Sequence, residues 1–291
     1  MATETDLLRE TIKAYGGSFE GLPDNLKTTL LRAAIIAQGG TCDDLPDNLE
    51  STLYNRLIET CSSSGGDEVV NIIDAENPTA NMLGEFTQLG KVCFPNATSL
   101  GTDAFRNCKS LTSVDLPNCT SLNYSAFDGC ASLIDADLPN CLSIDGGGFL
   151  NCTALKKVNI PKCESVASSG FFNTGLENIV LPSLTSMGYG VFSNTPNLKT
   201  VDFYQSVKIN SGNFSNSSVE AIVMRCINSV SEIDTYAFNG AAGDYHIYIP
   251  AALKAQYEAN AAEAVFADRF RALEDYTVDG TVTGALDESK I

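Results

Sequence analysis

The stretch Leu111-Thr112-Ser113-Val114-Asp115-Leu116-Pro117-Asn118-Cys119 leads to Phe127 and then to Cys130, and copies of it recur every 21 or 22 residues. The spacing Leu-x-x-Val-x-Leu-x-x-Cys returns in modified form at Leu133 and Leu155. Looser copies begin at Leu89, Leu176, Leu198 and Val219. A fixed period of this length is typical of a solenoid, in which each unit buries its apolar side only against its neighbours. The repeat therefore predicts a solenoid over about half of the chain.

Within each copy, a short alternating segment predicts a strand. Side chains of successive strand residues point to opposite faces, which places Val114 and Leu116 inside and Ser113 and Asp115 outside. Stacked copies should then form a parallel sheet of short strands on the concave face of an α/β solenoid. A proline cannot donate to a sheet ladder, so a proline column should mark where pairing stops. This column is Pro95, Pro117, Pro139, Pro161 and Pro182.

The second half of each copy carries a phenylalanine, most often after alanine or glycine. We interpret these phenylalanines as an aromatic spine inside the convex side of the solenoid, and not as a ligand site. The column is Phe105, Phe127, Phe149, Phe171, Phe192 and Phe214.

The repeat L-x-x-V-x-L-P-x-C-x-x-L-x-x-x-A-F-x-x-C resembles the bacterial BspA-type leucine-rich repeat over about residues 89–250, most closely over 111–163. The resemblance implies a leucine-rich repeat fold and a family often found in surface and host-contact proteins. After Ile222 the spacing changes, since Ala237-Phe238 comes three residues late, which indicates an insertion before the end of the solenoid.

Six of the ten cysteines fall into two columns of the repeat. Cys108, Cys130 and Cys152 form one column, and the other is Cys119, Cys141 and Cys163. Free cysteine behaves as a small buried hydrophobe, so we expect reduced thiols in the core. Disulfides and a metal site are the alternatives. Zinc sites favour close pairs such as C-x-x-C, whereas the nearest spacing within these columns is eleven residues.

The composition excludes several classes of partner. The 36 acidic and 18 basic residues give a net charge of −18, which disfavours nucleic acid and anionic membrane surfaces. No apolar run approaches the roughly 18 residues of a membrane-spanning helix. Residues 1–10 have neither the basic nor the apolar region of a secretory signal. We therefore expect cytoplasmic synthesis, with incorporation into a virion or a surface assembly as the route to exposure.

Residues 1–62 carry a different repeat. Gly16-Gly17 and Leu22-Pro23-Asp24-Asn25 return as Gly39-Gly40 and Leu45-Pro46-Asp47-Asn48, and the leucines between them have helical spacing. Asp24 and Asp47 lie where helix N-caps belong. We expect short helices that form a docking or assembly module, with homo-oligomerisation through it as a possible role. Such helices resemble N-terminal parts of proteins from tailed phages and prophages.

The domain prediction has four parts. Residues 1–62 form the helical module, 63–88 a polar linker and the N-terminal cap, 89–246 the solenoid, and 247–291 a helical C-terminal cap with an acidic tail. A helical period over 251–275 supports the C-terminal cap.

The sequence offers no catalytic set, so we predict a non-enzymatic protein without a cofactor. His246 is the only histidine, and we place it in a strand. No serine or cysteine nucleophile has a second candidate base. Gly146-Gly147-Gly148 lacks the Lys-Ser/Thr of a phosphate loop and is interpreted as a turn.

The outward strand positions are the candidate ligand-binding residues. They are Ser113, Asp115, Asp135, Asp137, Lys157, Asn159, Asn178, Thr200, Asp202 and Tyr204. In a regular stack Asp115, Asp137 and Asp202 share one column, with Asp135 in the next. Such carboxylates either hold Ca²⁺ or form a solvated acidic face, with Lys157 and Asn159 relieving the repulsion. No metal ligand is assigned.

The leading hypothesis is a recognition or adhesion protein that binds a protein or glycan through this face, as part of a phage or bacterial surface assembly. The alternative is a structural component in which the solenoid is a spacer or decoration.

Overall fold

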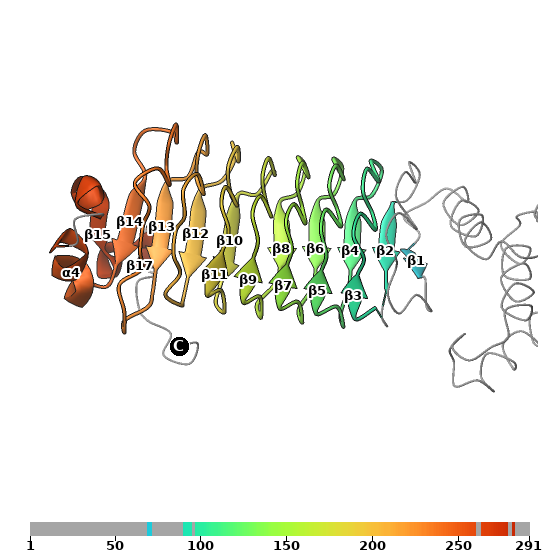
Figure 1. Ribbon diagram of the computed structural model, residues 1–291, viewed down its shortest axis with the longest axis horizontal. Coiled ribbons are helices and arrows are strands. Elements are labelled where there is room, and N and C mark those ends of the chain that lie inside the picture. The colour runs from blue at the N-terminus through green and yellow to red at the C-terminus, as the bar shows by residue number, and fades with distance from the viewer. Residues whose placement is uncertain (1–68, 72–89, 95–96, 260–262, 279–280, 283–291) are drawn as a thin grey trace, which may run out of the picture.

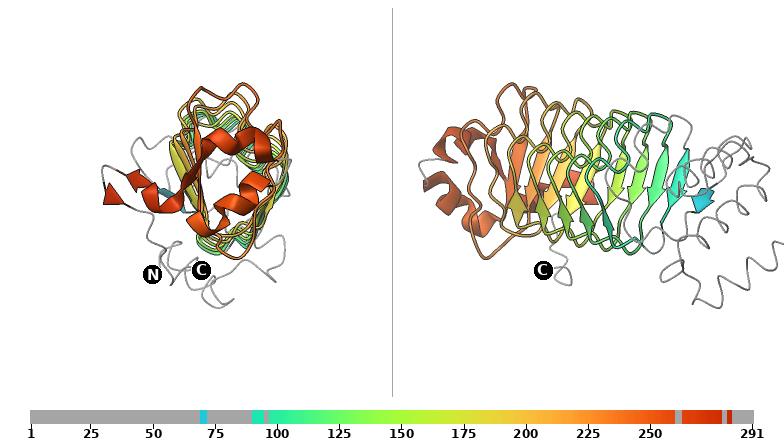
Figure 2. Two further views of the ribbon diagram at one scale, coloured as in Figure 1. Left: turned by 90° about the vertical axis from the view of Figure 1, so that its left-hand side faces the viewer. Right: turned by 45° about the vertical axis from the view of Figure 1, so that its right-hand side comes forward.

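The computed structural model describes residues 69–71, 90–94, 97–259, 263–278 and 281–282. These residues form a parallel-strand β-solenoid of about eight turns with little helix. The strands follow one another along the long axis (Figure 1), and the coils lie over one another when viewed down that axis (Figure 2). The predicted solenoid is therefore confirmed.

One face of the solenoid consists of two successive parallel sheets. The first contains, in order, β1 (Val69–Asn71), β2 (Lys91–Cys93), β4 (Ser113–Asp115), β6 (Asp135–Asp137) and β8 (Lys157–Asn159). The second contains β10 (Asn178–Leu181), β12 (Thr200–Phe203), β13 (Ala221–Met224), β14 (His246–Ile249) and β15 (Phe270–Ala272). β1 pairs with β2 at the 22-residue offset, so the strand column begins within the segment expected to be a cap.

A further parallel sheet, which the sequence analysis did not predict, runs along another face. Its two-residue strands are β3 (Ser99–Leu100), β5 (Ser121–Leu122), β7 (Ser143–Ile144), β9 (Ser165–Val166) and β11 (Ser186–Met187). The serines pair with one another in register, and the apolar residue of each strand is buried. Each of the five coils from β2 to β11 thus carries two strands, and the expectation of a single sheet was incomplete.

The predicted phenylalanine spine is confirmed in the interior. Rings of adjacent coils stack nearly parallel from Phe105 to Phe238, with centroid separations of 5.1 to 5.6 Å. Tyr245 continues the stack beyond Phe238 at 4.3 Å. The rings from Phe105 to Phe214 are fully buried, so the spine joins the coils into one apolar core.

The turn after each spine phenylalanine needs a residue with left-handed backbone geometry. The second residue after the phenylalanine has a positive φ in every coil from Phe105 to Phe238. These residues are Asn107, Gly129, Asn151, Asn173, Asn194, Asn216 and Gly240. Asparagine and glycine tolerate this conformation best, so the Phe-x-Asn/Gly pattern is the local signal for the turn.

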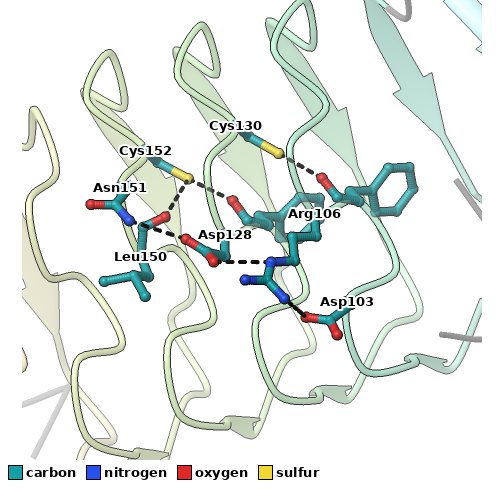
Figure 3. Close-up of polar contacts among 9 residues, drawn as sticks. Asp103, Arg106, Asp128, Cys130, Leu150, Asn151 and Cys152 are labelled. Carbon is teal, nitrogen blue, oxygen red and sulfur yellow. Dashed lines mark hydrogen bonds and ion pairs between the residues drawn. The ribbon is translucent and has the colours of Figure 1, made fainter. Parts of the chain in front are cut away.

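Both thiol columns are buried, as predicted, and Figure 3 shows two members of one column, Cys130 and Cys152. Cys130 Sγ donates to the Phe105 carbonyl at 3.0 Å, and Cys152 Sγ donates to the Phe127 carbonyl at 3.1 Å. In later coils the same position holds Thr174, Thr195 or Ser217, whose hydroxyls donate to the phenylalanine carbonyl of their own coil. The column therefore supplies a small side chain that satisfies a buried carbonyl.

A polar network on the same turns ties neighbouring coils together (Figure 3). Arg106 Nε lies 3.3 Å from an Asp128 carboxylate oxygen, and Asn151 Nδ2 donates to the other oxygen at 3.2 Å. Arg106 also approaches Asp103 at 3.6 Å. Asp128 is buried, so these contacts compensate for the loss of its hydration.

The continuous helical period expected over 251–275 is not what the structure contains. This region has η1 (Ala251–Leu253), α4 (Lys254–Ala259), η2 (Glu263–Arg269), strand β15 and η3 (Leu273–Asp275). Phe270 pairs with Ile247 of β14, so the chain adds one more strand to the sheet where a helix was expected. The buried Tyr257, Phe266 and Phe270 join the core at this end of the solenoid. An antiparallel pair, β16 (Thr277–Val278) and β17 (Thr281–Val282), follows.

The predicted helical module over residues 1–62, with its proposed self-association, lies outside the described residues. The predicted domain boundaries stay predictions.

Replacing Phe149 by alanine removes the ring that lies between Phe127 and Phe171. We expect the free energy of unfolding in urea to fall by about 3–5 kcal/mol, because a fully buried aromatic side chain leaves a cavity. The half-buried neighbour Phe172 is the matched control, and its replacement by alanine should cost only about 1 kcal/mol. Equal losses for both variants would contradict the assignment of the spine.

Alkylation should distinguish Cys226 from the thiols of the columns. Burial raises the pKa of Cys119 to about 11 and that of Cys163 to about 12. Burial also opposes ionisation of Cys226, but hydrogen bonds from Ser229 and nearby backbone groups outweigh it and hold the pKa of this thiol below its ordinary value of 9.0. At pH 8 iodoacetamide should therefore modify Cys226 before Cys119 and Cys163, which should react only after denaturation, as mapped by mass spectrometry. Equal rates in the native protein would contradict the buried columns.

Candidate recognition groove

The outward side chains of the first face come from positions held in register by the strand ladder. Asp115 pairs with Asp137, which pairs with Asn159, while Ser113 pairs with Asp135, which pairs with Lys157. Each pairing brings the side chains of adjacent coils to within about 5 Å of each other. Two short polar columns therefore run across β4, β6 and β8.

The ladder of this face is interrupted between β8 and β10. The described residues form two separate sheets here, whereas β10, β12 and β13 pair continuously. Leu116 and Leu138 each donate a backbone hydrogen bond to the next coil, but among the described residues Ile160, at the equivalent position, makes no such bond. The step from Leu155 to Leu176 is one residue shorter than 22, yet β12 and β13 pair across the same shortening. Coil length alone does not explain the interruption.

A hollow of about 1030 Å³ lies over this interruption and extends from β4 to β10, with Tyr204 just beyond β12 at one end. We call it the β8–β10 groove. It is lined by Ser113, Val114, Asp115, Asp135, Ala136, Asp137, Lys157, Val158, Asn159, Ile160, Pro161, Asn178, Ile179, Val180, Pro182 and Tyr204.

The half of the groove over β4 and β6 is acidic. Ser113 Oγ donates to Asp135 at 3.1 Å, and Asn159 Nδ2 donates to Asp137 at 2.6 Å. Both donors are neutral, so they orient the carboxylates without cancelling their charge. Asp115 and Asp137 are exposed, so this half presents negative charge to solvent.

The half of the groove over β8 and β10 is apolar. Val180 is 53% exposed, although it occupies the outward position that Asp115, Asp137 and Asn159 hold in the earlier coils. Val158 is half-buried, whereas Val92 and Val114 at the equivalent inward position are buried, so the interruption exposes part of the core. Pro161 and Pro182, which follow the strands, complete this apolar surface.

Eight of the ten predicted ligand-binding residues line the groove together. They are Ser113, Asp115, Asp135, Asp137, Lys157, Asn159, Asn178 and Tyr204. Thr200 lies elsewhere, in a second hollow of about 870 Å³ that also contains His246, Tyr248 and Tyr276. The sequence analysis missed Val180. An apolar residue in an outward column of polar residues could have identified it as a candidate contact residue.

Asp202 differs from the expectation that it shares an exposed column with Asp115 and Asp137. It is buried, 8% exposed, and forms a bidentate pair with Arg225, with N–O distances of 2.8 to 3.0 Å. Arg225 also lies over the ring of Tyr204, 5.2 Å from its centroid. Asp202 is buried because Arg225, from the next coil, lies against it and covers the outward position of β12.

The described residues contain no group of three or more histidine, cysteine or acidic side chains that could hold a metal ion. His246 lies in β14, as expected, and burial together with the nearby Arg271 and Arg269 lowers the pKa of its imidazole. Within the described part of the chain, no helix is both long and apolar enough to cross a membrane.

Comparison with known proteins identifies the repeat. The family model described as BspA type leucine rich repeat region matches this chain in six copies, over residues 83–199 and 120–243. The chain matches none of the curated proteins with which it was compared.

Several solved structures resemble the solenoid at low sequence identity. A leucine-rich cell surface protein from Faecalibacterium prausnitzii is 16% identical, with a TM-score of 0.41, and the match covers 64% of this chain and 82% of that one. The leucine-rich repeat protein of T. pallidum is 21% identical, with a TM-score of 0.44 and coverages of 58% and 82%. The pneumococcal vaccine antigen PcpA is 16% identical, with a TM-score of 0.41 and coverages of 61% and 50%.

The Arg225–Asp202 pair should be structural. Replacing Arg225 by alanine leaves the Asp202 carboxylate buried without its partner, and we expect the free energy of unfolding to fall by about 3–5 kcal/mol. Lys199 pairs with Glu220, and both are more than half exposed, so Lys199→Ala is the matched control and should cost less than about 1 kcal/mol. Urea titrations of both variants measure the difference, and similar losses would contradict the burial of this pair.

Proposed function

This chain belongs to the BspA-type leucine-rich repeat family, and from that premise we propose that it is a non-catalytic recognition or adhesion protein that binds a protein partner through the β8–β10 groove. The observation that carries the proposal is the groove itself. Eight of the polar or aromatic side chains that the repeat pattern predicted as ligand-binding residues line it. The groove also combines acidic and apolar surface in one hollow. Recognition sites commonly place a few polar groups around apolar contact surface.

The rest of the proposal concerns attachment. The solenoid would present the groove at a surface, and residues 1–62 would join it to a larger assembly, such as a bacterial surface structure or a virion. The alternative, in which the solenoid is a spacer and residues 1–62 drive oligomerisation, does not account for the acidic and apolar side chains that line one hollow.

A single substitution should block the groove without disturbing the fold. Val180→Arg places a long cationic side chain in the apolar half, and on an array of purified surface proteins and glycans we expect the full-length variant to lose the protein targets that the parent chain binds. Leu142→Arg is the matched control, because Leu142 is also an exposed apolar side chain but does not line the groove. Circular dichroism melting curves should be alike for the two variants.

Retention of every target by Val180→Arg would contradict recognition through the groove. Loss of targets by both variants would place recognition elsewhere or indicate a general effect of charge. Exclusive binding to glycans, abolished by Val180→Arg, would support the groove and contradict the protein partner.

A further inference from the structure

We infer that the hollow over β12, β13 and β14 is a second binding site, which takes a neutral oligosaccharide. We call it the β12–β14 hollow. It shares no lining residue with the β8–β10 groove, so the inference goes beyond the proposed function. Its volume of about 870 Å³ lies within the range of about 300–1,000 Å³ that is usual for small-molecule sites.

A small residue between two larger polar ones leaves space at the centre of the hollow. Thr200, Ala221 and His246 pair in register across three strands that form a continuous ladder. This pairing places Thr200 and His246 about 10 Å apart, with Ala221 between them. In earlier coils the same outward position holds Ser113, Asp135, Lys157 or Asn178. The short side chain of Ala221 therefore opens the surface between its two neighbours.

Two tyrosine rings bound this space. Tyr248 on β14 is half-buried, and the centroid of its ring lies 4.8 Å from that of Tyr276. Tyr276 follows η3 and belongs to a buried cluster with Ala221 and Val223, which fixes its ring on the outward side of the sheet. The C–H face of a sugar stacks on the apolar face of an aromatic ring, while the rim of a tyrosine stays polar. The rings thus offer a stacking surface beside the outward row.

Uncharged polar groups face the same space. Within the described structure, the side chains of Thr200, Ser218 and Tyr248 make no hydrogen bond. Elsewhere in the solenoid Thr112, Thr120 and Thr185 each donate to a backbone carbonyl of the preceding coil. A hydroxyl both donates and accepts, so the free hydroxyls of the hollow match those of a sugar.

The imidazole of His246 adds a further uncharged donor and acceptor. Burial, together with Arg271 and Arg269, lowers the pKa of His246, so the ring is neutral at neutral pH. One ring nitrogen then donates and the other accepts, which again suits a hydroxyl ligand.

The charges around the hollow are compensated within the protein. Lys199 forms an ion pair with Glu220, and an Asp244 oxygen lies 3.9 Å from Arg269. Arg269 also donates to the Gly243 carbonyl at 2.8 Å, which ties the rim to the solenoid. A charged ligand therefore finds no unbalanced charge, in contrast to the acidic half of the β8–β10 groove.

The lining favours a sugar over a protein partner. Val219 and Ala221 line the hollow but are buried, so no large aliphatic side chain is exposed among the lining residues. In the β8–β10 groove, by contrast, Val180 is 53% exposed. The centre of a protein interface is usually apolar, and the β12–β14 hollow offers tyrosine rings and polar groups in its place.

NMR spectroscopy of the untagged full-length protein tests the inference. His246 is the only histidine of the chain, so its imidazole signal reports on the hollow directly. The probes are the neutral hexasaccharides cellohexaose, maltohexaose, mannohexaose and N-acetylchitohexaose, each at up to about 10 mM. We expect at least one of them to shift the His246 signal in a saturable manner. Raising NaCl from about 20 mM to about 500 mM should leave this binding nearly unchanged.

Variants separate the roles of the ring and the hydroxyls. Tyr248→Ala should weaken binding of that hexasaccharide by about tenfold or more, while Tyr248→Phe keeps the ring and should weaken it by about threefold or less. Thr200→Val removes one hydroxyl and should weaken it by about threefold or more. Tyr236 is an exposed tyrosine outside the hollow, so Tyr236→Ala is the matched control and should leave binding unchanged.

The absence of a saturable shift with every hexasaccharide would overturn the inference, as would equal losses for Tyr248→Ala and Tyr236→Ala. Tighter binding of the acidic hexagalacturonate than of each neutral probe would contradict a neutral ligand. These failures remain distinguishable from failure of the proposed function, because Val180→Arg tests the β8–β10 groove with protein targets and should not change hexasaccharide binding.

Discussion

Stacking of each coil on the next is the constraint on which the structure depends. A coil has no core of its own, so its phenylalanine, its inward strand residues and the small residue after the turn must each meet the same position in the adjacent coil. The nearly parallel rings from Phe105 to Phe238 show this contact between equivalent positions most directly. Backbone hydrogen bonds between neighbouring coils, such as that from the Phe105 amide to the Ala126 carbonyl, hold the turns in the same register.

The apolar part of the groove exists because β8 and β10 do not pair, while the phenylalanine stack and the pairing of β9 with β11 continue through the same coils. The rings of Phe149 and Phe171 stack at 5.4 Å, and Ser165 on β9 still pairs with Ser186 on β11. The ladder between β8 and β10 is absent in the described structure, and it is here that Val158 and Val180 become accessible. A solenoid tolerates such a local loss because the remaining contacts between the two coils keep them together. The apolar half of the groove is therefore a departure from the repeat, whereas the acidic half follows from it.

The sequence predicted those features that repeat and missed those that do not. The phenylalanine spine, the buried thiols and the outward Asp115 and Asp137 follow from period and alternation, which are properties of each coil alone. The strands around Leu122 and its equivalents were missed because two residues are too few for an alternation pattern to be read. Burial of Asp202 depends on Arg225 in the next coil, and Phe270 becomes a strand because β14 offers an edge. Both depend on a partner distant in sequence, which local patterns do not specify.

Hydrogen exchange at one backbone amide tests the central claim that the stack is continuous except between β8 and β10. The amides of Leu116 and Leu138 donate to Asp137 and Asn159 in the following coil at 2.9 Å, whereas Ile160, their equivalent, makes no such bond among the described residues. Residue-resolved exchange by NMR should therefore show faster exchange for Ile160 than for Leu116 and Leu138, with the amides of Phe149 and Phe171 protected alike. Protection of Ile160 equal to that of Leu116 and Leu138 would mean that the ladder is closed in solution, and would contradict this account of the groove.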